Sequence, residues 1–325
     1  LDEIFSRLID EAQILLPDFG KDLAIDGKAI SSVATGCNKN KKPDGRRDLD
    51  ANWGIKEYKG TREDGTLWSK TVKWFGYCLH LIVDANYELP VAFDVTCASA
   101  SETIKAHEMI DDLAQKRPDL MQKCETFAAD KGYDDTKLHT KLWDKFKIKP
   151  VIDIRNMWKD KDQNFTRQLQ NCENVIYNYK GNVYCVCMET GTRREMSIGG
   201  FEKDRKKHGT LKKLCPAKQY GIKCKYMEKC RAKHGIRIDI ELDRRIFTPI
   251  DRASYKWDKC YRKRTSVERV NSRLDVSFGF EKHYIRGIKK MKVRCFIALS
   301  VMLAMAVGRI KQNQPDKVRS LVKSA

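Results

Sequence analysis

The stretch YRKRTSVERVNSRL, residues 261–274, predicts a helix around which the rest of the chain can be organised. Val267, Val270 and Leu274 recur at helical spacing, and Phe278 can extend the same apolar stripe. An apolar stripe on an otherwise charged helix indicates that this side packs against a core.

A second face of the same predicted helix is polar. Tyr261, Arg264, Glu268 and Asp275 lie zero, three, seven and fourteen positions along it, so they are expected on one side. Glu268 is a carboxylate within a run of arginines and lysines. A lone acid in such a run usually balances local charge, so a functional role for Glu268 depends on carboxylates elsewhere in the chain.

The composition indicates a folded protein with a polyanionic partner. Hydrophobic residues make up 41% of the 325 residues, and 64 basic residues against 44 acidic ones give a net charge of +20. Solubility alone rarely needs so large an excess, and nucleic acid is the usual partner of such a chain.

The cellular setting is expected to be intracellular and away from membranes. Residues 1–20 are amphipathic and carry acids, unlike a secretory leader. We find no apolar run long enough to cross a membrane, and the apolar stretch 295–307 is expected to be a buried helix. The twelve cysteines are therefore expected to be mostly reduced. The chain starts at Leu1, so upstream sequence is expected to be missing.

Apolar periodicity and turn residues predict an α/β fold with a mixed sheet flanked by helices. Helices are expected at 2–16, 102–117, 134–146 and 293–310, and strands at 23–27, 71–83, 89–97, 125–130 and 149–154. Residues 35–70 are polar and rich in glycine, and they are expected to form a long loop.

Residues 155–247 interrupt this pattern. They contain short β-like pieces and a basic stretch with cysteines, which indicates a β-containing insertion before the helix at 261–274. The expected organisation is an N-terminal helix at 1–20, a core in two parts at 21–154 and 248–325, and an insertion subdomain at 155–247.

Two further carboxylates close apolar strands. Asp26 and Asp130 each end a strand, where α/β sheets place groups that handle ligands. Together with Glu268 they can hold two divalent ions about 4 Å apart, which is the arrangement that cleaves phosphodiesters. Mg²⁺ suits such oxygen ligands. Spacing alone makes this only suggestive, because 44 acids offer many such triples.

Four motifs resemble one known family. These are AIDGK at 24–28, WFGYCLHLIVD at 74–84, AADKGYD at 128–134 and RTSVER at 264–269. In this order they resemble the motifs of bacterial insertion-sequence transposases of the DDE class, over about residues 22–310.

The resemblance implies an RNase H-like catalytic domain in which Asp26, Asp130 and Glu268 bind two Mg²⁺ ions, with Mn²⁺ as a substitute. It implies hydrolysis of phosphodiesters at the element's ends and transfer of the 3′-hydroxyl to target DNA. It also implies a homodimer on double-stranded DNA at the bacterial nucleoid, in the cytoplasm. The helix at 1–20 would then be the remnant of an upstream DNA-binding region.

The resemblance also implies residues that contact DNA. Tyr261 and Arg264 match the family's helix signature, but Asp275 stands where the family has a lysine. Arg273 or Lys282 can replace that lysine, and Lys131 follows the second carboxylate. We therefore expect DNA contacts from Tyr261, Arg264, Arg273 and Lys131. The alternatives are an intrahelical Arg264–Glu268 pair and a Tyr261 that covers the core.

Other residues have two interpretations each. His80 either lies near the active site or, more commonly for such a residue, in the core. The basic runs 205–213 and 286–294 are either phosphate tracks or solvated faces, and Trp68, Trp74 and Trp158 are candidates for base stacking.

The expected insertion offers zinc ligands. They are His208, Cys215, Cys224, Cys230 and His234, but the cysteine spacings of nine and six residues are wider than a tight zinc knuckle. Reduced thiols are the favoured interpretation. Cys185 and Cys187 alternate on a strand and are expected in the core.

Three functions stay open from the sequence. The leading hypothesis is a DDE transposase. The second is an RNase H-like nuclease or an inactive transposase relic, for which Asp275 is the hint. The third is a DNA-binding module organised by zinc.

Overall fold

The computed structural model describes residues 2–34, 48–159 and 165–321. The chain forms two compact units, each described here by itself. Unit 1 comprises residues 1–124 and 263–325, and unit 2 comprises residues 125–262. The expected limits at residues 20, 154 and 247 stay a prediction.

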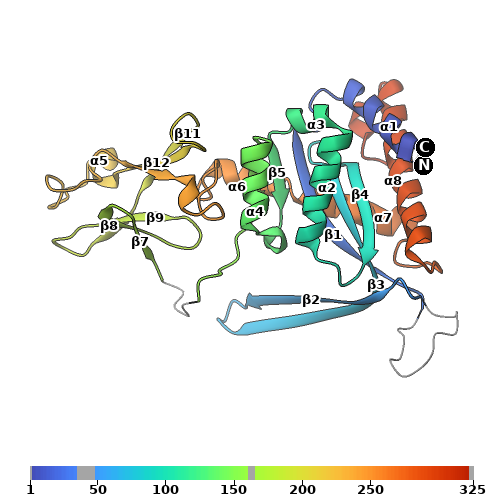
Figure 1. The fold of residues 1–325 in the computed structure, drawn as a ribbon, viewed down its shortest axis with the longest axis horizontal. Coiled ribbons are helices and arrows are strands. Elements are labelled where there is room, and N and C mark those ends of the chain that lie inside the picture. The colour runs from blue at the N-terminus through green and yellow to red at the C-terminus, as the bar shows by residue number, and fades with distance from the viewer. Residues whose placement is uncertain (1, 35–47, 160–164, 322–325) are drawn as a thin grey trace. The chain divides into compact units, whose positions relative to one another are not determined.

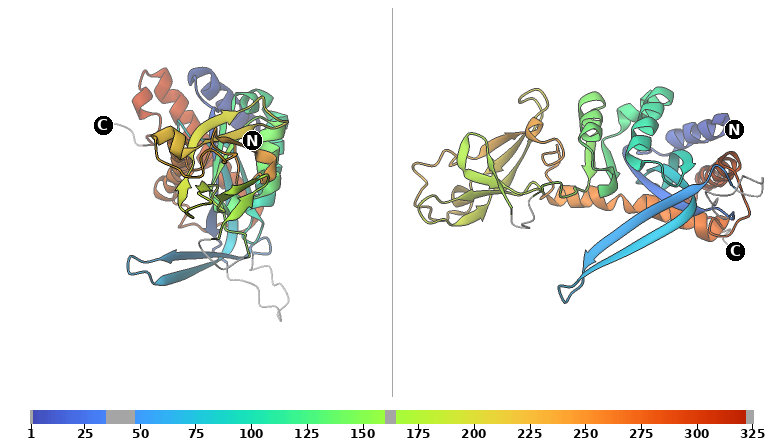
Figure 2. Two further views of the ribbon diagram at one scale, coloured as in Figure 1. Left: turned by 90° about the vertical axis from the view of Figure 1, so that its left-hand side faces the viewer. Right: turned by 60° about the horizontal axis from the view of Figure 1, so that its bottom comes forward.

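The sheet of unit 1 is antiparallel and centred on one long strand. Its strands are β1 (Asp22–Ser31), β2 (Asn52–Thr61), β3 (Leu67–Asp84) and β4 (Leu89–Cys97). β3 pairs with β1, β2 and β4. The outer parts of β2 and β3 form a two-stranded hairpin that extends beyond the rest of unit 1 (Figure 2).

This hairpin corrects the expected loop at 35–70. Residues 52–61 and 67–70 are strand, and residues 35–47 lie outside the described part. Gly54 and Gly60 favoured a loop in the sequence, but tryptophan rings of β3 lie over both glycines. A Cβ on Gly54 would stand 2.4 Å from the Trp74 ring, and one on Gly60 would stand 2.5 Å from the Trp68 ring. The glycines therefore make room for aromatic cover within a strand pair.

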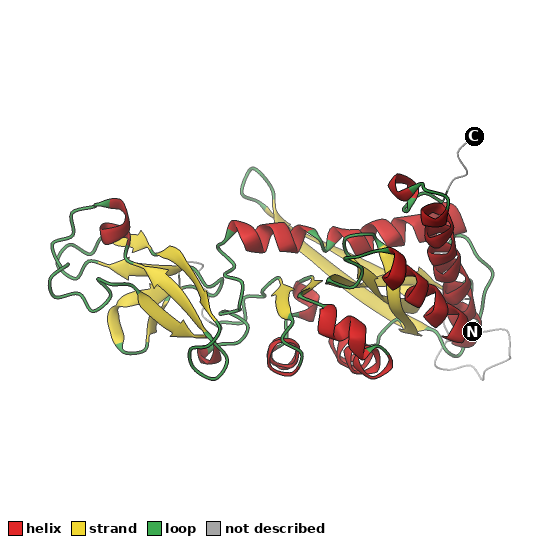
Figure 3. Cartoon of the chain, turned by 90° about the horizontal axis from the view of Figure 1, so that it is seen from above, coloured by secondary structure: helices red, strands yellow, loops and turns green. Residues whose placement is uncertain are grey.

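Helices cover both faces of this sheet (Figures 1 and 3). They are α1 (Asp2–Leu15), α2 (Glu102–Lys116), α3 (Pro118–Lys123), α7 (Thr265–Phe278) and α8 (Ile288–Lys311). α2 packs on β3 and β4, whereas α7 packs on β1 and β3. α8 packs on α1 and β4. Ser101 caps α2, because its hydroxyl accepts from the backbone N–H of Ile104.

Helix α8 differs from the expectation that no apolar run of the chain is long enough to cross a membrane. By length and composition alone α8 is long and apolar enough to do so, and half of its most apolar window is buried inside the protein. Its buried residues include Met291, Cys295, Leu299 and Leu303. These contacts fit the expected role of a core helix, as its packing on α1 and β4 shows.

Unit 2 begins with a parallel strand pair, β5 (Thr126–Ala129) and β6 (Lys149–Ile152). A 3₁₀ turn (Lys131–Tyr133), α4 (Thr136–Thr140) and a π-helical turn (Lys141–Lys145) connect them. The described chain thus combines antiparallel and parallel pairing with flanking helices, and the predicted mixed α/β, RNase H-like fold class is confirmed.

Two small sheets follow β6 within unit 2, where a β-containing insertion was expected. The first has the order β10-β9-β8-β7 and the second β11-β12-β13. Their strands are β7 (Arg167–Leu169), β8 (Cys172–Tyr177), β9 (Val183–Val186), β10 (Arg193–Glu195), β11 (Ser197–Glu202), β12 (Thr210–Leu214) and β13 (Ile236–Asp239). α5 (Pro216–Tyr220) follows β12, and a 3₁₀ turn (Ile240–Leu242) follows β13. Val175, Val183 and Phe247 lie in a shared buried core.

The helix predicted at 261–274 is two helices. α6 (Tyr255–Arg262) ends before α7 begins at Thr265. The backbone N–H groups of Ser266 and Val267 donate to the carbonyls three residues earlier, at 3.0 and 3.2 Å, which tightens the turn. Tyr261 therefore belongs to α6 and Glu268 to α7, and the single face that they were expected to share stays a prediction.

Candidate active site

Asp26 lies on β1, and the strand register fixes the face to which it points. Asp26 pairs with Leu81 and Gly27 pairs with His80 in the β1–β3 ladder. Because side chains alternate along a strand, Asp26 shares one face with Lys28, while His80 points to the opposite face. Asp26 is half-buried, and its Oδ1 accepts from the backbone N–H of Gly27 at 2.8 Å.

Two ion pairs place α7 along that face of β1. Lys263, just before α7, donates to Asp22 near the start of β1. Asp275, near the end of α7, lies 2.5 Å from Lys28 Nζ. Asp22, Asp26 and Lys28 are two or four residues apart, so they point to one side of the sheet.

The lengths of the two elements agree with this alignment. Twelve residues of helix span roughly 18 Å and six residues of strand span roughly 20 Å, so α7 and β1 run side by side in one direction. With the same rise per residue in each element, Glu268 and Asp26 are offset by only roughly 6 Å along the shared direction of α7 and β1. Glu268 and Asp275 lie seven residues apart on one stripe of α7, and Asp275 already contacts β1. Asp26 and Glu268 therefore lie on the same side of the sheet of unit 1.

Glu268 pairs with Arg264 in the described structure. Arg264 Nη1 lies 2.6 Å from Glu268 Oε1, and the Glu268 side chain is 48% exposed. The intrahelical pair that stood as the alternative for Arg264 is thus present. The carboxylate stays accessible to solvent at the first turn of α7, where the helix dipole favours a negative charge.

Asp275 departs from the family's lysine, and the structure shows what balances it. The Lys28–Asp275 pair is only 13% and 22% exposed. An ammonium group therefore lies beside residue 275, but it belongs to Lys28 of β1 and not to a residue of α7. Lys282 lies beyond α7 and is exposed.

A second lysine near Asp26, Lys56, is one that the sequence pattern did not indicate. Lys56 on β2 forms an ion pair with Glu102 at 2.8 Å and donates to the Gly27 carbonyl at 3.2 Å. Burial opposes its charge, but the nearby carboxylate of Glu102, helped by Asp26, outweighs burial and raises the pKa of Lys56. Lys56 was missed because residues 35–70 were expected to form a loop.

Gly27 leaves room for the Glu102 side chain at the start of α2. A Cβ at this position would stand 2.5 Å from Glu102 Oε1 and 3.2 Å from Cys78 Sγ. The glycine after Asp26 thus lets the Glu102 carboxylate lie against the backbone beside the site.

His80 is a core histidine. It is fully buried, and its Nε2 lies 2.8 Å from Thr96 Oγ1. Burial lowers the pKa of His80 to about 4, so the ring is neutral at physiological pH. Its position on the face opposite Asp26 supports the core interpretation.

Asp130 occupies the turn that follows β5 in unit 2. It caps the 3₁₀ turn, since its Oδ1 accepts from the backbone N–H of Gly132 at 2.7 Å. Asp130 is half-buried and Lys131 is exposed. The turn therefore fixes the backbone on both sides of the carboxylate.

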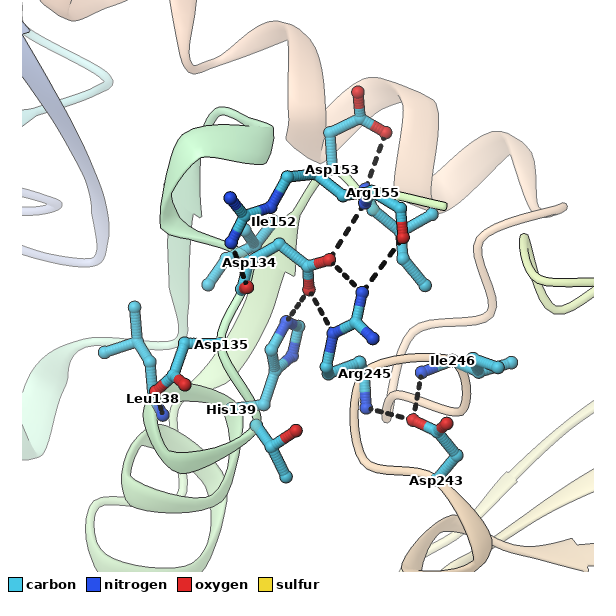
Figure 4. Close-up of polar contacts among 12 residues, drawn as sticks. Asp134, Asp135, Leu138, His139, Ile152, Asp153, Arg155, Asp243, Arg245 and Ile246 are labelled. Atoms are coloured by element: carbon cyan, nitrogen blue, oxygen red, sulfur yellow. Dashed lines mark hydrogen bonds and ion pairs between the residues drawn. The ribbon is translucent and has the colours of Figure 1, made fainter. Parts of the chain in front are cut away.

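A buried cluster around Asp134 holds this turn in place (Figure 4). Asp134 accepts from Arg245 Nε at 3.1 Å and from the backbone N–H of Arg155 at 2.9 Å. His139 Nε2 lies 3.4 Å from Asp134 Oδ1. Burial opposes ionisation, but hydrogen bonds from His139 and Arg245 outweigh it and hold the pKa of Asp134 well below its usual range. Asp134 belongs to the motif AADKGYD. The sequence did not indicate its contact with Arg245, which lies 111 positions further along the chain.

Two residues expected to contact DNA have intramolecular contacts. Tyr261 stacks on Trp257 of the same helix, with ring centroids 4.7 Å apart. Arg273 donates to the carbonyls of Glu88 and Arg319, and burial lowers its pKa. These contacts favour an anchoring role for Arg273 at the end of the β3–β4 turn.

Some basic side chains in the two runs predicted to follow DNA phosphates form contacts within the protein instead. Lys213 is buried and pairs with Asp251 at 2.6 Å, and Arg205 pairs with Glu202 at 3.1 Å. Arg294 donates to the carbonyl of Phe278 at 2.8 Å. Of the three tryptophans, Trp74 is buried, whereas Trp68 on the hairpin is 38% exposed.

The histidines considered as zinc ligands point elsewhere. His208 contacts Asp144 and Glu241 at 2.9 and 3.1 Å, and His234 Nδ1 lies 3.3 Å from Lys218 Nζ. Within residues 2–34, 48–159 and 165–321, no three His, Cys, Asp or Glu side chains are already grouped to hold a metal ion.

Comparison with protein families identifies the chain. A family model described as "Transposase DDE domain" matches residues 19–304, a range that includes Asp26, Asp130 and Glu268. Comparisons with curated proteins and with solved structures found no match. The matched range covers most of the chain. The chain therefore belongs to the family of DDE transposases, enzymes that cleave DNA strands and transfer them to new positions.

Proposed function

We propose that this transposase hydrolyses phosphodiesters at the ends of an insertion sequence and joins the released 3′-hydroxyl to target DNA. Asp26, Asp130 and Glu268 are the proposed catalytic carboxylates. The observation that carries this proposal is the alignment of α7 with β1, which brings Glu268 to the side of the sheet on which Asp26 lies.

The donor set of these residues fits two divalent cations. All three groups offer carboxylate oxygens, the ligands that Mg²⁺ prefers, and Mn²⁺ accepts the same donors. Asp26 and Asp130 are half-buried, and Glu268 is accessible. Ions held there would activate water and stabilise the leaving oxygen of the phosphodiester.

The chain's own residues perform the remaining tasks. Lys56, which pairs with Glu102 and donates to the Gly27 carbonyl, keeps a positive charge close to the strand that carries Asp26. Arg264 can exchange its contact with Glu268 for a DNA phosphate, because a guanidinium pairs with either oxyanion. Lys131, exposed next to Asp130, and Tyr261 are the other proposed DNA contacts.

The proposed partner is double-stranded DNA, both at the element's ends and at the target, and the proposed assembly is a homodimer on paired ends. The net charge of +20 supports binding to a polyanion. We place the protein at the nucleoid in the bacterial cytoplasm, as its family suggests.

The second candidate from the sequence, a nuclease or an inactive relic, rested on Asp275. The Lys28–Asp275 pair balances this charge within the fold, so Asp275 is no sign of a decayed site. The full transposase reaction is therefore the better-supported function.

A strand-transfer assay tests the proposal. Oligonucleotides that carry the inverted repeats flanking the gene are incubated with a plasmid target and Mg²⁺. Wild-type protein and the control Glu189→Gln, an exposed acid of unit 2, should yield joined products. Asp130→Asn should yield neither cleavage nor joining while it still binds DNA. Joined products from Asp130→Asn would overturn the assignment, and cleavage without joining by the wild type would favour the nuclease.

A further inference from the structure

Five cysteines of unit 2 line one small cavity. They are Cys185, Cys187, Cys215, Cys224 and Cys230. The cavity has a volume of about 20 Å³, which is room for a single water molecule or ion. The proposed DNA chemistry uses none of these thiols, and they come from three separate segments of the chain.

Cys187 lies in a tight turn directly after β9. The backbone N–H groups of Thr190 and Gly191 donate to the Cys187 carbonyl at 3.3 and 2.7 Å, and Gly191 has a φ of +67°. The turn holds Cys187 at the lining of the cavity.

Cys224 and Cys230 lie in the segment that faces this turn. Cys224 lines the same cavity as Cys187. Cys230 accepts from Asn174 Nδ2 at 3.1 Å, and Asn174 is buried. Side chains that donate to a ligating sulfur are the usual support around a metal site.

The segment between α5 and β13 has no helix or strand hydrogen bonds to hold it in place. Residues 221–235 contain turns but no helix or strand, although they carry two of the thiols. Cys215 precedes α5 directly, on the other side of the same cavity. Long segments without secondary structure in small domains are often held by a metal or by disulfides, and the cysteines described here are all free.

Cys185 differs from the other four. It lies within β9, where it pairs with Val175 and Arg194. A strand position leaves its sulfur as part of the cavity wall, whereas the other four thiols lie in turns or at a helix start.

We propose that Cys187, Cys215, Cys224 and Cys230 bind one zinc ion, which fixes residues 221–235 onto the β9 turn. Four thiolates are a common ligand set for structural zinc, and binding releases the thiol protons to solvent. The sulfurs do not already enclose an ion in the described structure, so binding draws the side chains inward. The wide cysteine spacing argued against zinc in the sequence, because Cys187, the missing fourth ligand, was assigned to a strand.

Metal analysis of the full-length chain tests this site. The wild type should retain one zinc per chain after purification without chelator. After extraction and addition of Co²⁺ it should show the intense thiolate-to-cobalt absorption of a tetrahedral site. Cys187→Ser and Cys224→Ser should lose zinc and this absorption. The controls Cys185→Ser, from the same cavity, and Cys97→Ser, from unit 1, should keep both.

Several outcomes decide the question without relying on transposition. Wild-type protein without zinc and without cobalt–thiolate absorption would overturn the proposal, as would equal metal loss in Cys185→Ser and Cys187→Ser. If the serine variants do not fold, proton release on adding Zn²⁺ to the extracted wild type still tests it, and no release would contradict it. Asp26→Asn should keep its zinc, so failure of the catalytic proposal and failure of this one are distinguishable.

Discussion

At the scale of single residues, the Lys28–Asp275 pair is central to the candidate site. It joins β1 to α7 through two side chains that are mostly buried. The ammonium group comes from a residue 247 positions away from its partner. Replacing Asp275 by the lysine that the family has at this position would therefore place two positive charges, those of Lys28 and of the new lysine, side by side.

Asp275→Lys should lower the free energy of unfolding by about 2 kcal/mol, a value between those of exposed and buried pairs. It should also reduce cleavage, because α7 loses one of its two anchors on β1. Lys28→Asp combined with Asp275→Lys should recover most of the stability. Urea unfolding measures both, with the exposed Asp316→Lys as control. A more stable and more active Asp275→Lys single variant would contradict this account of the pair.

Asp134 gives a second prediction, with a defined pH dependence. Its pKa is lower in the folded chain than the usual value of about 3.9, so its stabilisation is present above about pH 4 and is lost as pH falls below that. Asp134→Asn should cost about 3 kcal/mol at pH 7, because Arg245 loses its buried partner.

The loss on acidification should be smaller in the Asp134→Asn variant than in the wild type. Unfolding by urea at pH 7 and at about pH 3, within the range where the stabilisation is lost, measures this, with the exposed Asp204→Asn as control. Equal acid sensitivity of the wild type and Asp134→Asn would show that Asp134 does not contribute the effect.

At the scale of elements, the ends of α7 determine where Glu268 lies. α7 ends at Gly279, which has a φ of +62°, and Arg294 donates to the carbonyl of that glycine at 2.8 Å. Glycine is favoured there because other residues rarely adopt this conformation. Gly308 lies within α8 without a positive φ, and a Cβ there would meet nothing within 4 Å.

The same substitution should therefore have opposite effects at these two glycines. Gly279→Ala should destabilise the protein by about 1 kcal/mol, because it strains the end of α7. Gly308→Ala should stabilise it by up to about 1 kcal/mol, because alanine is the better helix former. Thermal unfolding compares the two variants. A stabilising Gly279→Ala would show that the end of α7 is not constrained as described.

Elements with a local signal could be predicted from the sequence, whereas those that depend on distant partners could not. Asp26 and Asp130 each follow an apolar run, and this pattern is visible within a few residues. Asp130 does follow the end of β5, but Asp26 was wrongly expected to close its strand, because β1 continues through its pairing with β3 to Ser31. The β2–β3 hairpin was missed because the tryptophan rings that cover Gly54 and Gly60 come from the neighbouring strand. Lys56, Lys28 and Arg245 were missed because each acts on a carboxylate far along the chain.

At the scale of the whole molecule, the excess of basic residues should govern DNA binding. Ion pairs within the fold neutralise some of the basic side chains, such as Lys213 and Lys292, but the net charge of +20 persists. Phosphate contacts by the remaining cations release condensed counterions, so affinity depends on salt.

Affinity for a random duplex should fall about a thousandfold or more between about 50 and 200 mM salt. Fluorescence anisotropy at several salt concentrations measures this. Lys131→Ala should reduce the slope of the logarithmic plot by about one, because one phosphate contact is lost. Lys159→Ala, a change at another exposed lysine of unit 2, is the control. A flat salt dependence would rule out binding through phosphates.

Nicking of supercoiled plasmid DNA in Mg²⁺ tests the central claim most directly, because it needs no knowledge of the element's ends. Each proposed catalytic acid is compared with a neighbour on the same element or turn: Asp26→Asn with Asp22→Asn, Asp130→Asn with Asp134→Asn, and Glu268→Gln with Asp275→Asn. All six proteins are first checked for folding and for binding to DNA. We predict that the first member of each pair has no detectable nicking, while each folded neighbour retains measurable activity. Nicking by Asp26→Asn, Asp130→Asn or Glu268→Gln at the rate of its neighbour would contradict the assignment of the three carboxylates.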